Sequence, residues 1–105
     1  MQTDVEQLLS WYNENLGRLS KMFAEVSVRS FEPGNVIEGK VVIEVGSAAM
    51  VGSVTFWNKG DVEVLRLDLP ADGRDPVVID DRHRLHSEHI PSLLEKYFES
   101  LARGA

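Results

Sequence analysis

Cysteine is absent from this sequence of 105 residues, and its absence excludes disulfides, thiolate metal sites and cysteine nucleophiles. Small secreted domains usually compensate for a small core with disulfides, so we expect this chain to be cytoplasmic. No apolar run approaches the roughly 20 residues that a membrane-spanning helix needs. The first residues also lack the basic and apolar regions of a signal peptide, which leads to the same expectation.

Catalytic motifs are missing as well. The sequence contains no phosphate-binding loop, no dinucleotide-binding fingerprint and no Gly-x-Ser-x-Gly turn. All three histidines lie in the segment 80–89, which matches no zinc signature and which we interpret as a solvated loop. The acidic pair Asp80 and Asp81 would need a sugar-sized cleft to act as a glycosidase pair. We therefore expect no enzyme activity, no catalytic residue, no metal and no cofactor.

The charge is one-sided: 17 acidic and 11 basic residues give a formal net charge of −6. An acidic chain repels phosphate backbones, so we expect no nucleic-acid partner. The same charge would steer the protein toward a basic partner. The length suits one domain, and we predict a single domain over residues 1–105.

Both ends of the chain have apolar residues at steps of three and four, which predicts a helix at each end. We expect the first helix to end between Leu16 and Ser20 because Gly17 weakens its last turns. Trp11 lies at the margin of the first apolar stripe. The first stripe is Val5, Leu8, Leu9, Tyr12, Leu16, Leu19 and Phe23, and the second is Ile90, Leu93, Leu94, Tyr97, Phe98 and Leu101.

Between the helices the apolar period changes to two, which predicts strands joined by short turns. Short connections favour an antiparallel meander, so we predict an α+β fold with both helices on one face of a four- or five-stranded sheet. In the segment 62–69 the valines occupy even positions and the leucines odd positions. A β-bulge near Val64 and Leu65 would bring both sets to the same face of the sheet, and we predict one there. The predicted strands are 24–29, 40–45, 50–57, 62–69 and a short segment at 76–79.

The second face of such a sheet is left open. Strand alternation places Trp57 on that face, opposite to Phe56. Tryptophan is enriched at interface hot spots, so Trp57 is a candidate partner anchor. In the alternative, Trp57 is structural: a loop or the region around Trp11 covers it, or it shields the edge of the sheet. The residues that we predict to bind a partner are Trp57, Thr55, Glu44, Asp61, Glu63 and Arg29.

Four sequence features, taken in their order along the chain, resemble those of a known protein family. They are a helix with Trp11, the segment 51–60 (VGSVTFWNKG), the segment 62–64 (VEV), and the segment 85–88 (LHSE) before the last helix. In this order they resemble the TriTu-type immunity proteins of Rhs-associated polymorphic toxins, which are delivered by type VI secretion. The sequence departs from the family in having Asn58 and Lys59 where an acidic residue or serine is common, and in a longer loop at 70–75.

The resemblance implies a cytoplasmic protein that binds a cognate ADP-ribosyltransferase toxin directed at the translation factor EF-Tu. Neutralisation would come from occlusion of the active site of the toxin or of its target-docking surface. The family has no catalytic residues to carry over. The toxin is thus the expected partner, with no membrane partner, and we favour a monomer.

Two other classes stay open. The first is a small acidic secretion or effector chaperone, which would dimerise through a hydrophobic strand or helix and wrap an unfolded client. The second is a small-ligand-binding or enzymatic α+β domain. A toxin gene directly upstream would favour the immunity protein over the chaperone.

Overall fold

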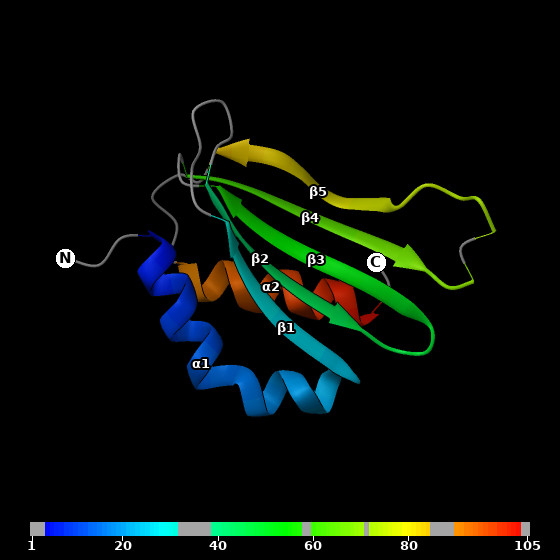
Figure 1. Cartoon of the computed structure of the whole chain (residues 1–105), viewed down its shortest axis with the longest axis horizontal. Coiled ribbons are helices and arrows are strands. Elements are labelled where there is room, and N and C mark those ends of the chain that lie inside the picture. The colour runs from blue at the N-terminus through cyan, green and yellow to red at the C-terminus, as the bar shows by residue number, and fades with distance from the viewer. Residues whose placement is uncertain (1–3, 32–38, 58–59, 71, 85–89, 104–105) are drawn as a thin grey trace.

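The computed structural model describes residues 4–31, 39–57, 60–70, 72–84 and 90–103. Five antiparallel strands form one sheet in the order β1-β2-β3-β4-β5, and a helix precedes and follows it (Figure 1). The predicted α+β meander is confirmed. The elements are α1 (Asp4–Met22), β1 (Glu25–Phe31), β2 (Lys40–Gly46), β3 (Met50–Trp57), β4 (Asp61–Asp68), β5 (Val77–Arg84) and α2 (Ile90–Arg103).

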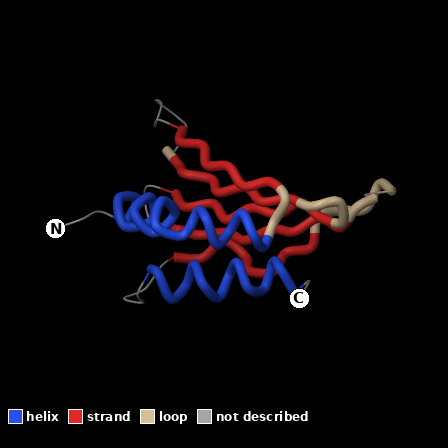
Figure 2. Tube along the Cα trace, turned by 90° about the horizontal axis from the view of Figure 1, so that it is seen from below, coloured by secondary structure: helices blue, strands red, loops and turns tan. Residues whose placement is uncertain are grey.

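The two helices lie side by side against the same face of the sheet, as Figure 2 shows from below. The core fills the space between this helix-covered face and the helices. All six apolar residues of the predicted second stripe are buried in α2, which confirms that stripe. The strands contribute the alternate residues Val41, Ile43, Val45, Met50, Val54, Phe56, Val62 and Val64, all of them buried.

The first helix differs from its prediction in two ways. It continues through the exposed Gly17 to Met22, so the predicted end between Leu16 and Ser20 is wrong. Trp11 is only 5% exposed and stacks on Phe98 of α2 at a centroid distance of 5.6 Å, whereas Leu16 is 37% exposed. The reason is that α1 packs against α2 as well as the sheet, which turns its buried stripe toward Trp11 and away from Leu16.

The predicted bulge lies in a different strand. β4 pairs with β3 without any shift, so its apolar residues occupy both faces: Val62 and Val64 face the helices, and Leu65 lies on the other side. The register shifts occur between β4 and β5. From the pair Val62–His83 to the pair Val64–Asp80, β5 advances by three residues and β4 by two, so the extra residue lies in β5.

The last strand is also longer than predicted. β5 runs from Val77 to Arg84, so Asp80–Arg84 are strand residues and not the solvated loop that we expected. Their charged side chains hide the strand in the sequence, because an edge strand with bulges keeps no clean alternation of apolar and polar residues. The remainder of the histidine segment, 85–89, lies outside the described residues.

Candidate partner-binding face

The face of the sheet opposite the helices, here called the open face, is covered by strand side chains alone in the described part of the chain. The strand register arranges these side chains in rows. One row runs Phe31, Lys40, Trp57 across β1, β2 and β3. The next row runs Arg29, Val42, Thr55, Glu63 across β1 to β4.

The open face is hollowed over these two rows and over the residues that follow them along the strands, with a volume of about 460 Å³. Alternation places Trp57 on this face and Phe56 in the core, where Phe56 is 2% exposed, so the predicted orientation of Trp57 is confirmed. The hollow brings together five of the six predicted partner-binding residues. The sixth, Asp61, does not line the hollow and forms an ion pair with Arg82. The five are Arg29, Glu44, Thr55, Trp57 and Glu63.

Trp57 is half-buried because an arginine from β5 covers its ring. The guanidinium carbon of Arg82 lies 4.0 Å from the centroid of the indole. Asp61 holds Arg82 there, with its Oδ2 accepting from Nε at 3.0 Å and pairing with Nη2 at 2.9 Å. Neither a described loop nor Trp11 covers Trp57, since Trp11 lies in the core on the other side of the sheet. The region around Trp11 therefore does not cover Trp57, whereas coverage by a loop stays a prediction, because 32–38, 58–59 and 85–89 lie outside the described residues.

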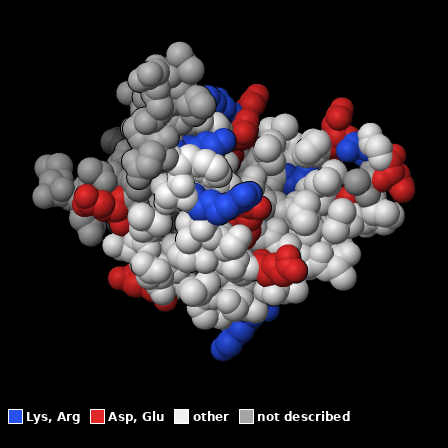
Figure 3. All heavy atoms as spheres, in the orientation of Figure 1, with Lys and Arg blue, Asp and Glu red and all other residues white. Residues whose placement is uncertain are grey.

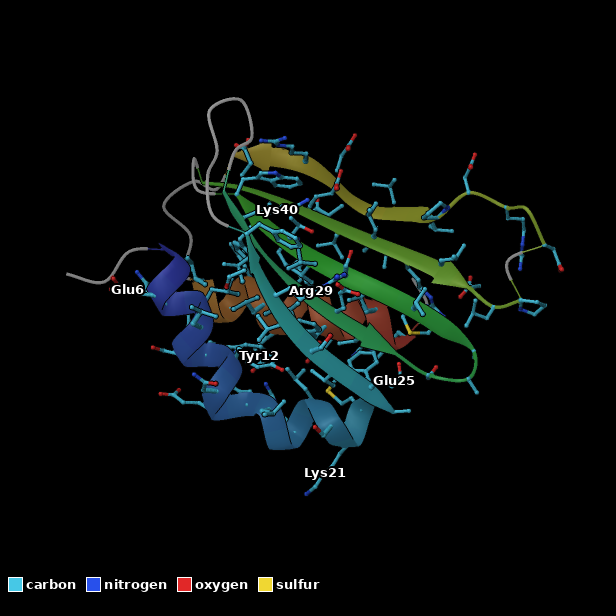
Figure 4. The ribbon with its side chains drawn as sticks, in the orientation of Figure 1. Glu6, Tyr12, Lys21, Glu25, Arg29 and Lys40 are labelled. Carbon is cyan, nitrogen blue, oxygen red and sulfur yellow. The ribbon has the colours of Figure 1, made fainter. Side chains whose placement is uncertain are left out.

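The second charged pair of the face joins β1 to β2. Arg29 donates from Nε to Oε1 of Glu44 at 2.7 Å, and its Nη2 bonds to the same oxygen (Figure 4 labels Arg29). Phe31 lies beside this pair, with the Lys40 ammonium 5.2 Å from its ring centroid. Glu44 and Asp61 are both paired within the chain, so a partner meets a charge-balanced surface and not an acidic one. Figure 3 shows basic and acidic side chains next to each other over this view of the molecule.

Thr55 has little surface to offer to a partner. Only 7% of the residue is exposed, because its neighbours in the row, Val42 and Glu63, flank it across the strands. Thr55 can support the floor of the hollow, whereas Glu63 and Trp57 are half-buried and reach its surface.

Several residues of the open face were missed at the level of sequence. Arg82 belongs to the part of β5 beyond the predicted segment 76–79, and Val78, although within that segment, was not assigned to the open face. Leu65 and Leu67 line the hollow from β4. The odd phase of these leucines was the available signal: it indicated apolar residues on the second face, but we interpreted it as a bulge.

Within the described residues, no three side chains of histidine, aspartate or glutamate come together as a metal site. No helix in the described ranges is long and apolar enough to cross a membrane. Residues 58–59 and 85–89, which carry part of the family resemblance, lie outside the described residues.

Comparison with known proteins gives no relative of this chain. No protein-family model matches it, and neither a curated protein nor a solved structure matches it. The resemblance to immunity proteins consequently rests on the motifs quoted above.

Proposed function

We propose that this protein is a cytoplasmic, non-enzymatic immunity protein that binds and neutralises a toxin through the open face of its sheet. The observation that carries the proposal is the half-buried Trp57 at the hollow of that face, with Arg82 over its ring. The family resemblance extends the proposal to the kind of toxin, an ADP-ribosyltransferase acting on EF-Tu.

The composition of the open face suits a protein partner. Large apolar side chains that are exposed surround its charge-balanced centre: Phe31 is 42%, Val51 41% and Val78 52% exposed. Protein interfaces combine apolar contacts with polar ones, and aromatic residues and arginine are enriched in them. A site for a small ligand would instead enclose most of the ligand surface, which an open sheet face does not do.

The molecule as a whole is wide enough for a protein interface. It extends 40 by 32 Å across the view that looks down its shortest axis (Figure 1). A standard interface buries about 800 Å² on each partner, which fits within that outline.

The test is the affinity of Trp57→Ala for the ADP-ribosyltransferase domain, measured by titration calorimetry together with the melting temperature. Truncation of an anchor costs at least about 2 kcal/mol, so we expect binding to weaken by about 30-fold or more. Lys21→Ala, on α1 and away from the open face in Figure 4, is the control and should bind like the wild type. Unchanged affinity in Trp57→Ala, whatever happens to its stability, would refute the anchor.

The same titration separates the chaperone class from the immunity protein. An immunity protein binds the folded toxin domain, and its binding should prevent ADP-ribosylation of EF-Tu. Binding to the unfolded toxin chain, with none to the folded domain, would instead support a chaperone.

A further inference from the structure

The two edges of the sheet are protected to different degrees. At one edge, β5 is broken by register shifts and carries Asp80 and Asp81, two devices that block pairing with another strand. At the other edge, β1 pairs with β2 over its full length without a shift and contains no proline. Apart from the β2 ladder, no backbone hydrogen bond among the described residues reaches β1. As far as the described residues extend, its outer side is therefore a regular template for another strand, which none of them blocks.

The charges on β1 are self-complementary. Glu25 and Arg29 lie on the open face at equal distances from Ser27, one on each side. If a second copy of β1 pairs antiparallel about Ser27, Glu25 of each copy faces Arg29 of the other, and Val26 faces Val28. Directly opposed residues share a face of the sheet, so both ion pairs and both valine pairs can form.

The helix layer offers a matching apolar contact. α1 is the helix that neighbours β1, and Arg18 of α1 pairs with Glu95 of α2. Leu16 lies about 160° around the helix from Arg18, at 3.6 residues per turn, and so on the flank that faces away from α2. Leu16 is 37% exposed, and Val26 and Val28 are only half-buried. A second copy beyond β1 would cover all three.

We propose that the protein forms a two-fold symmetric homodimer through β1, in place of the monomer that we favoured from the sequence. The two five-stranded sheets join into one, and both open faces point to the same side. The contact is one short strand and a helix flank per copy, at the small end of specific interfaces, so a reversible dimer is expected. The proposal does not depend on the proposed function, because the dimer leaves Trp57 uncovered.

The test is sedimentation equilibrium of the full chain and of charge-reversal variants. Glu25→Arg and Arg29→Glu each place like charges opposite one another, and the symmetry repeats this twice per dimer. We expect the dimer dissociation constant of each variant to rise by at least about fivefold. An equimolar mixture of the two variants restores both attractive pairs, so it should form a heterodimer with nearly the affinity of the wild type.

Arg103→Glu is the matched control, because it makes the same charge change at an exposed position of α2, and it should dimerise like the wild type. Arg29→Glu also loses its pair with Glu44, so the melting temperature of each variant is recorded; Glu25→Arg gives the second, independent readout. A wild type that is monomeric at every concentration overturns the proposal. A dimer that Glu25→Arg leaves unchanged, or a mixture that stays monomeric, overturns it as well. Trp57→Ala should dimerise normally, which separates this test from that of toxin binding.

Discussion

Replacement of Gly52 on β3, even by alanine, is predicted to destabilise the protein, and the structure allows the cost to be worked out. A Cβ at this position would lie 2.8 Å from Cδ2 of Leu101 and 3.1 Å from Cε of Met50. It would also lie 3.3 Å from the backbone oxygen of Leu65. Carbon atoms in contact prefer about 3.5–4.0 Å, so Leu101, which is fully buried, has to move.

Overpacking of this kind costs about 1–3 kcal/mol. Replacing glycine within a strand recovers about 0.5–1 kcal/mol, because the unfolded chain loses freedom. We therefore expect Gly52→Ala to lower the free energy of unfolding by about 1.3 kcal/mol, the midpoint of a range from about 0 to 2.5 kcal/mol. At about 4 °C per kcal/mol for a domain of this size, the melting temperature should fall by about 5 °C.

The assay is thermal and urea unfolding followed by circular dichroism, with Gly17→Ala as the control. Gly17 is exposed in α1 with no atom within 4 Å of an added Cβ, so alanine there should stabilise by about 0.5–1 kcal/mol. Leu101→Val removes the Cδ atoms, so the double variant with Gly52→Ala should lose less stability than the two single losses combined. If Gly52→Ala is instead more stable than the wild type by about 0.5–1 kcal/mol, as loss of a strand glycine alone would give, the close packing of α2 on β3 is not as described.

Three further outcomes follow from the fold. Phe98→Ala removes the ring that stacks on Trp11 and should cost about 3–5 kcal/mol in urea unfolding, and a loss below about 1 kcal/mol would contradict that stack. Gly60→Ala forces a side chain into a left-handed φ of 95° and should lower the thermal stability by about 1–2 kcal/mol; an unchanged melting temperature would argue against this turn. Arg18→Met removes an exposed pair with Glu95, so unfolding should change by less than about 1 kcal/mol, and a larger loss would mean that the pair is more than a surface contact.

The helices and the first four strands could be predicted because each depends on a local period. A stripe at steps of three and four identifies a helix, but it does not say which flank meets the other helix. For that reason Trp11 was placed at the margin and Leu16 in the core, whereas contact with α2 reverses the two. The later part of β5 could not be predicted from any local pattern in the sequence, because an edge strand with bulges is defined by its pairing with β4.

The open face was predictable only where strand alternation defines it. Alternation along β3 was enough to place Trp57 opposite to Phe56. The position of Arg82 over the indole depends on β4 and β5 being neighbours and on the register between them, which no local pattern contains. The pairing of Glu44 with Arg29 likewise needs the register between β1 and β2.

The strand order β1-β2-β3-β4-β5 has a consequence for the way this chain folds during synthesis. Every strand pairs with its neighbour in sequence, so the sheet can grow one hairpin at a time as the chain leaves the ribosome. The residues of α2 arrive after all five strands, although they supply Leu94, Phe98 and Leu101 to the core. Until then only α1 can cover the apolar side of the sheet. The nascent chain is therefore most exposed to aggregation in the interval between the completion of β5 and the docking of α2.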